Sequence, residues 1–101
     1  MNPEEYSEIL KALADRTRQR LVKTLISGEF SVNELAERLD ISQFNASKHL
    51  RVLRQAGIVG VRAKGQRREY FIAEAFRDRL NREGMTLDFG CCTFRMDRLP
   101  S

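Results

Sequence analysis

Basic side chains that could bind a polyanion are concentrated in the middle of the chain. Seven of the protein's 18 Lys and Arg residues lie between Ile41 and Arg68, and none of its 14 Asp and Glu residues does. The remaining sequence holds 11 basic and 14 acidic residues, so a positive block stands in a mildly acidic chain. This segregation predicts a face that binds nucleic acid or a similar polyanion. The basic residues of the block are Lys48, Arg51, Arg54, Arg62, Lys64, Arg67 and Arg68.

Thiols are the second group with distinctive chemistry. Cys91 and Cys92 are adjacent and are the only cysteines. Thiolates bind soft ions such as As(III), Sb(III), Cu(I), Zn(II) and Cd(II), but neighbours on a strand point to opposite faces, so a shared ion requires a turn at Gly90 or a second chain. Alternatively, Arg95 and Arg98 favour the thiolate and a redox response, or both cysteines pack as small hydrophobes. The sequence leaves these three uses open.

Length and composition predict a single domain without a catalytic centre. The 101 residues suit one domain, and 42% hydrophobic residues suffice for a core. No run approaches the roughly 20 apolar residues of a membrane helix, and the acidic N-terminus is unlike a secretion signal. We therefore expect a cytoplasmic protein without a membrane partner. We expect no enzyme either, because His49 is the sole histidine and no nucleophile triad, phosphate-binding glycine loop or carboxylate pair can be assembled.

Capping residues predict four helices up to the middle of the basic block. Asn2 is expected to cap a first helix from Pro3 to Ala14, and Asp15 a second that ends at Gly28. Ser31 and Glu34 form a capping box for a third helix to Leu39, and Ser42 caps a fourth that stops at Gly57. Only three residues separate the last two helices, which predicts the steep crossing of a helix-turn-helix.

A two-stranded wing and a fifth helix are predicted after Gly57. Apolar residues flank Lys64-Gly65-Gln66, as in a β-hairpin with a basic tip, and a short helix follows from Glu74 to Glu83. The fold class is therefore mainly α with a small β-hairpin, a winged helix-turn-helix of order α-α-α-α-β-β-α. We assign residues 1–84 to a DNA-binding and dimerisation domain and 85–101 to a tail that carries the adjacent cysteines.

The fourth helix is expected to enter the major groove of double-stranded DNA, where its N-terminal residues would lie nearest the bases. The amides of Gln43 and Asn45 can contact adenine, and the wing arginines can follow the backbone or enter a minor groove. Phe44 is expected to pack against the third helix, with contact to a thymine methyl as the alternative. RNA is a poorer partner because its A-form major groove is too narrow for a helix. The predicted DNA-binding residues are Ser42, Gln43, Asn45, Ser47, Lys48, His49, Arg51, Arg54, Arg62, Lys64, Arg67 and Arg68.

Between about residues 9 and 73 the chain resembles the ArsR/SmtB family of bacterial winged-helix repressors. The resemblance implies a homodimer that binds a palindromic operator until it senses an inducer. It also implies a dimer interface between the first and last helices, with Tyr6, Leu10, Phe76 and Leu80 as candidates. The matching segments are Leu10–Arg18, Val32–Ala36, Ile41–Gln43, Ser47–Leu53, Ala56–Val59 and Arg68–Phe71.

The familiar metal ligands of that family are missing from this sequence. Metal-sensing members often carry Cys-x-Cys where this chain has Ser31-Val32-Asn33, and others use histidines on the last helix, where it has none. The expected effector is therefore a thiophilic ion at Cys91 and Cys92, or an oxidant acting on the same thiols. Two rivals remain that bind no DNA: a thiol metal carrier and a winged helix that binds another protein.

Overall fold

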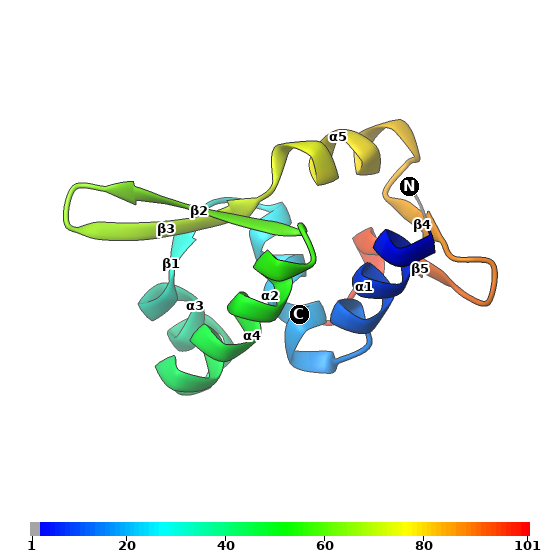
Figure 1. The fold of residues 1–101 in the computed structure, drawn as a ribbon. Coiled ribbons are helices and arrows are strands. Elements are labelled where there is room, and N and C mark those ends of the chain that lie inside the picture. The colour runs from blue at the N-terminus through cyan, green and yellow to red at the C-terminus, as the bar shows by residue number, and fades with distance from the viewer. Residues whose placement is uncertain (1–2) are drawn as a thin grey trace.

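The computed structural model describes residues 3–101 and confirms the winged helix-turn-helix. Its helices are α1 (Pro3–Leu13), α2 (Arg16–Ile26), α3 (Val32–Leu39), α4 (Gln43–Gln55) and α5 (Glu74–Arg82). The strands β2 (Val59–Lys64) and β3 (Arg67–Ile72) form a wing that extends away from the helices (Figure 1). None of the helices described is long and apolar enough to cross a membrane. Asn2, the expected cap of the first helix, lies outside the described residues.

Side-chain caps set the limits of the helix-turn-helix. In α3 the Ser31 hydroxyl accepts a hydrogen bond from the Glu34 backbone N–H, and the Glu34 carboxylate accepts one from the Ser31 N–H, as the sequence predicts. Asp40 ends α3 in the left-handed conformation, with φ of 54°. The Ser42 hydroxyl then accepts from the Asn45 N–H and opens α4. These contacts fix the turn between α3 and α4, and therefore the orientation of α4 relative to α3.

The sheet contains a third strand that the sequence pattern does not predict. Strand β1 (Phe30–Ser31) pairs antiparallel with β3, giving the order β1-β3-β2. Phe30 lies opposite Tyr70 in this register. The wing is thereby tied to the segment that leads into α3, so the hairpin and the helix-turn-helix are held in one arrangement.

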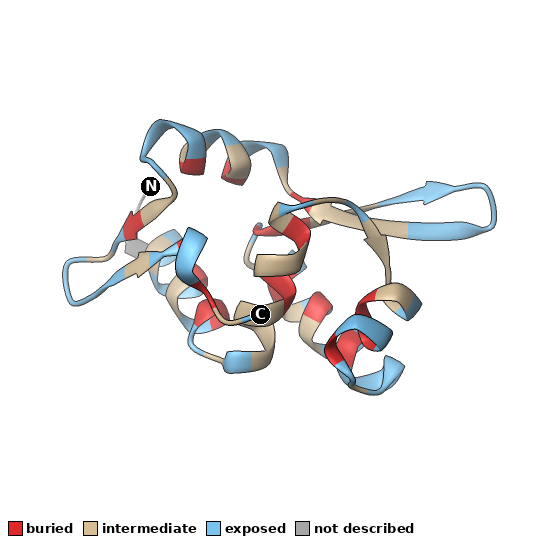
Figure 2. Cartoon of the chain, turned by 180° about the vertical axis from the view of Figure 1, so that it is seen from behind, coloured by how far each residue is buried: buried red, intermediate tan, exposed pale blue. Residues whose placement is uncertain are grey.

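The hydrophobic core runs from the helices into the C-terminal tail. Strands β4 (Thr86–Asp88) and β5 (Thr93–Arg95) form a second hairpin, followed by a short 3₁₀ helix, η1 (Met96–Arg98). Leu87 and Met96 are fully buried in the same core as the helical leucines, and Figure 2 shows buried positions both in the helices and in the C-terminal tail. The tail is therefore packed against the body of the protein.

Two of the four expected dimer residues are buried within the chain itself. Phe76 and Leu80 are 5% and 1% exposed and belong to the core, so the prediction that they face a partner is wrong for this chain. Tyr6 and Leu10 remain partly exposed. The Tyr6 ring packs edge-on against Phe89 of the tail, with centroids 5.7 Å apart.

Candidate nucleic-acid interface

Helix α4 buries one stripe and exposes the other. Ala46, Leu50 and Leu53 are fully buried, because their spacing places them on the face toward the core. The opposite face carries exposed polar and basic side chains, and no ion pair within residues 3–101 involves its three cations. Those exposed residues are Gln43, Asn45, Ser47, Lys48, Arg51 and Arg54, with the cap Ser42 before them.

Phe44 lies in solvent and not against α3. Its side chain is 77% exposed, and it is the only large hydrophobic residue so exposed among the side chains described, residues 4–101. The expected packing against α3 is therefore wrong. Nothing in the helical pattern alone distinguishes the two outcomes, because Phe44 lies in the first turn, where a small rotation decides whether a ring meets α3 or solvent.

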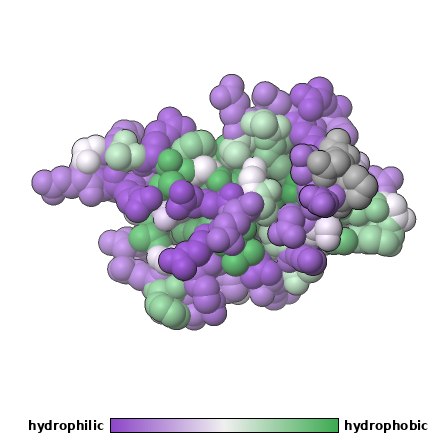
Figure 3. All heavy atoms as spheres, in the orientation of Figure 1, coloured by the Kyte–Doolittle hydropathy of each residue, from purple (hydrophilic) through white to green (hydrophobic). Residues whose placement is uncertain are grey.

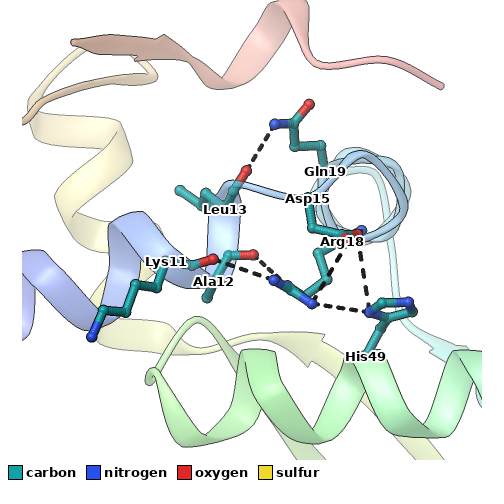
Figure 4. A network of polar contacts seen from close by, with 7 residues as sticks. All are labelled: Lys11, Ala12, Leu13, Asp15, Arg18, Gln19 and His49. Atoms are coloured by element: carbon teal, nitrogen blue, oxygen red, sulfur yellow. Dashed lines mark hydrogen bonds and ion pairs between the residues drawn. The ribbon is translucent and has the colours of Figure 1, made fainter.

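His49 faces inward from α4, unlike the other DNA-binding candidates. Arg18 Nη1 lies 3.1 Å from His49 Nδ1, and Arg18 also donates to the carbonyl oxygens of Ala12 and Lys11 (Figure 4). Arginine can only donate, so His49 Nδ1 accepts and the ring is neutral, with its proton on Nε2. The His49 side chain is only 16% exposed. It connects α4 to the α1–α2 turn, and its assignment as a DNA contact is corrected to that of a positioning residue.

The charges around His49 reinforce the neutral ring. Burial lowers the pKa of His49, and the positive charges of Arg18 and Lys48 lower it further against the opposing carboxylate of Asp15. Burial also disfavours the ionised form of Asp15, but the hydrogen bond from the Arg18 N–H and the charge of Arg18 outweigh it and lower the pKa of Asp15. In the acidic range where Asp15 titrates, the protonated His49 ring lowers it further. The network therefore holds a carboxylate, a guanidinium and a neutral imidazole at neutral pH.

The wing cations are partly neutralised by carboxylates from outside the acid-free block. Arg62 pairs with Glu29 at 3.3 Å and Arg67 pairs with Glu34. Lys64 lies 3.9 Å from Glu69, at the margin of an ion pair. No such pair within residues 3–101 involves Arg68. Figure 3 shows that the extended wing is mostly hydrophilic on this face.

Glu34 serves the cap and the ion pair together. Hydrogen bonds from the Ser31 N–H and hydroxyl lower the pKa of Glu34, and the charge of Arg67 lowers it further. The carboxylate thus stays ionised beside the wing. The positive charge that the wing offers to DNA is therefore smaller than the count of its Lys and Arg residues suggests. The sequence could not show that Glu29 and Glu34 lie beside the wing.

The adjacent thiols lie at the tip of the β4–β5 hairpin, at the opposite end of the molecule from the wing (Figures 1 and 2). Both are exposed, and their sulfur atoms are 3.7 Å apart. Gly90 makes the turn with φ of 86°, and its N–H donates to the Asp88 carboxylate. The interpretation of Cys91 and Cys92 as buried hydrophobes is therefore wrong, and the turn expected at Gly90 is present.

The surroundings of Cys92 do not favour its thiolate. A hydrogen bond with Cys91 raises the pKa of Cys92, and the nearby negative charge of Asp88 raises it as well. Arg95, expected to act in the other direction, pairs instead with Asp97 at 3.3 Å. Within residues 3–101, no group of three or more His, Cys, Asp or Glu side chains is placed to hold a metal ion. One chain therefore offers two sulfur ligands and no third protein ligand.

Comparison with known proteins adds independent information. The family model described as "Helix-turn-helix domain" matches residues 13–62. The "Biofilm growth-associated repressor" of Agrobacterium fabrum is 47% identical over 70 residues, 69% of this chain. The chain spans only 60% of the length of that relative.

Two solved structures share most of the fold. One, described as a possible transcriptional regulator for arsenical resistance, is 40% identical with a TM-score of 0.63, covering 74% of this chain and 78% of its own. The other is the homodimeric winged helix-turn-helix domain of a possible ArsR-family regulator from Mycobacterium bovis. It is 29% identical to this chain with a TM-score of 0.73, and the match covers 81% of this chain and 76% of the Mycobacterium bovis chain.

Proposed function

Because the chain belongs to the ArsR family of winged helix-turn-helix regulators, we propose that it is a DNA-binding transcriptional repressor. The observation that carries this proposal is the exposed polar and basic face of α4, which begins at a capped N-terminus and lies beside a basic wing. Gln43 and Asn45 would read bases, and the cations of α4 and the wing would bind phosphates. A protein that acts on chromosomal DNA in this way would work in the cytoplasm.

The proposal predicts strong, salt-dependent binding to double-stranded DNA. With six to eight phosphates neutralised, affinity should fall by roughly three to four decades between 50 and 200 mM salt. A gel shift on the DNA upstream of its own gene, at two salt concentrations, tests this directly. Weak binding even at low salt would contradict the repressor and favour a protein-binding winged helix or a metal carrier. Stronger binding to a matched RNA duplex would contradict the assignment of α4 to a major groove.

We propose a homodimer as the DNA-binding form, in line with the homodimeric relative from Mycobacterium bovis. A groove between α1 and α5 is lined by the accessible residues Glu8, Ala75, Arg79 and Arg82, and it offers a surface for a partner's helix. A twofold dimer would present two α4 helices about 34–36 Å apart, one turn of DNA. Sedimentation analysis should give twice the chain mass of 11.7 kDa, and a monomer that still binds a palindrome tightly would contradict the arrangement.

We propose that the effector is a thiophilic metalloid ion, with As(III) as the first candidate. Support comes from the exposed dithiol and from the relative described as a regulator for arsenical resistance. Arsenous acid, As(OH)₃, can condense with both thiols, forming two As–S bonds and releasing two waters. The thiol protons leave in the water, so the raised pKa of Cys92 does not prevent the reaction.

The test compares wild type with a Cys91→Ser, Cys92→Ser double variant in a DNA-binding assay. As(III) should release wild-type protein from DNA and leave the double variant bound, with equal DNA affinity for both before addition. Sb(III), Cu(I), Zn(II), Cd(II) and hydrogen peroxide are tested in parallel. Release by peroxide alone would favour the redox alternative. Release of the double variant would place the sensor elsewhere.

A further inference from the structure

Phe44 is an apolar ring that the protein leaves in water. It is the second residue of α4, and 77% of its surface is exposed. Burying a phenylalanine side chain stabilises a protein by about 1.5–3 kcal/mol, and this chain forgoes most of that contribution at Phe44. Among the side chains described, no other large hydrophobic residue is comparably exposed. Single apolar residues are common on protein surfaces, so the position of Phe44 has to show whether the ring has a role.

The position of Phe44 on α4 indicates which partner. Lys48 follows four residues later and Arg51 seven later, so the three lie along one side of the helix. All three are exposed, whereas the neighbouring stripe of Ala46 and Leu50 is buried. The N-terminal residues of a recognition helix are the ones that contact the base edges. The ring therefore occupies the place of a base-contacting residue.

The chemistry of the ring limits what it can recognise there. Phenylalanine has no hydrogen-bonding group, and the one apolar feature of the major groove is the C5-methyl group of thymine. The geometry points to Phe44 as a specificity-determining residue that packs on a thymine methyl in each operator half-site. This inference rests on the proposed function, and it adds a preference for thymine that the amides of Gln43 and Asn45 do not supply.

The methyl contact can be tested on a duplex that the protein itself selects. Full-length protein first selects its preferred sequence from a random duplex library. Each thymine of that duplex is then replaced in turn by uracil, which lacks the methyl group but pairs identically. Loss of one methyl contact should weaken wild-type binding roughly fourfold per half-site, and about 15-fold when both half-sites are changed. Fluorescence anisotropy gives the dissociation constants.

Variants identify the ring as the cause. Phe44→Ala should bind the thymine and uracil duplexes equally, Phe44→Leu should keep part of the difference, and Gln43→Ala should keep all of it. Wild-type protein indifferent to uracil at every position, or Phe44→Ala that retains the full difference, overturns the inference while the proposed function stands. A library that yields no preferred sequence overturns both. Loss of the dimer mass in Phe44→Ala would show instead that the ring contacts a second copy of the chain, and would also overturn it.

Discussion

Replacing Arg51 and Arg67 separately should show that the two cations contribute unequally to DNA binding. Arg51 is exposed on α4 and takes part in no ion pair within residues 3–101, whereas Arg67 is paired with Glu34. A phosphate that reaches Arg51 displaces only solvent ions. A phosphate that reaches Arg67 has to replace a carboxylate, which then remains nearby and repels it.

The size of the difference follows from counterion release. Each phosphate contact changes the slope of log affinity against log salt concentration by about 0.9, and a twofold dimer carries every contact twice. Arg51→Ala should therefore reduce the magnitude of the slope by about 1.8, and Arg67→Ala by distinctly less. The unpaired cations Lys48, Arg51, Arg54 and Arg68 would together give a wild-type slope of about −7.

The assay is anisotropy of a labelled duplex, titrated at salt concentrations from about 50 to 200 mM. Arg98→Ala, an exposed cation outside the proposed face, is the matched control and should leave the slope unchanged. Glu34→Gln keeps the hydrogen-bond acceptor of the capping box but removes the charge, so it should steepen the slope by freeing Arg67. Equal slopes for Arg51→Ala and Arg67→Ala, or an unchanged slope in Arg51→Ala, would refute the reasoning.

Three further predictions concern stability. Gly60→Ala should lower the free energy of unfolding by about 1–3 kcal/mol in urea titrations, because a Cβ atom there would lie 2.6 Å from the Phe71 ring; an unchanged midpoint would mean that the ring moves freely. Ser31→Ala should lower it by about 0.5–2 kcal/mol through loss of the N-cap, and Ser31→Asn, which can also cap, should recover most of that loss. The melting temperature should fall as the pH drops from about 6.5 toward the lowered pKa of His49, and it should fall again below about pH 4, where the lowered pKa of Asp15 takes effect. In both ranges the unfolded chain binds more protons than the folded chain, so protonation favours unfolding. His49→Gln should remove the upper decline, and a variant that keeps it would assign the decline to other groups.

The helix-turn-helix could be predicted because its signals are local. Ser31 and Glu34 are three residues apart, as are Ser42 and the Asn45 N–H that it accepts from, so the caps are visible in a short window. The buried stripe of α4 follows from helical spacing alone. The exposed face of the candidate site was therefore predictable in outline, including the position of most of its cations.

Features that depend on distant segments could not be predicted in the same way. The carboxylates of Glu29 and Glu34 contact wing arginines that lie 33 residues further along the chain. Arg18 and His49, which also contact each other, are 31 residues apart in the sequence. The strand β1 has two residues and no period that could reveal it. In each case a partner from another element decides the outcome, either by neutralising a cation or by turning a side chain inward.

The separation of the thiols from the proposed DNA face constrains how an effector could act. The β4–β5 hairpin lies at the far end of the molecule from the wing, so an ion bound there would not compete with DNA for the same surface (Figure 1). Helix α2 contacts both the helix-turn-helix and the end of the tail that follows the hairpin. Arg20 donates to the carbonyl oxygens of Ser101 in the tail and of Leu39 at the end of α3, and Arg18 contacts His49 of α4. A shift of the tail would therefore reach α4 through α2, by altering the contacts that hold the helix-turn-helix. For the same reason, removal of both thiols should leave DNA affinity intact, since the residues that set it are held by α2 and not by the hairpin.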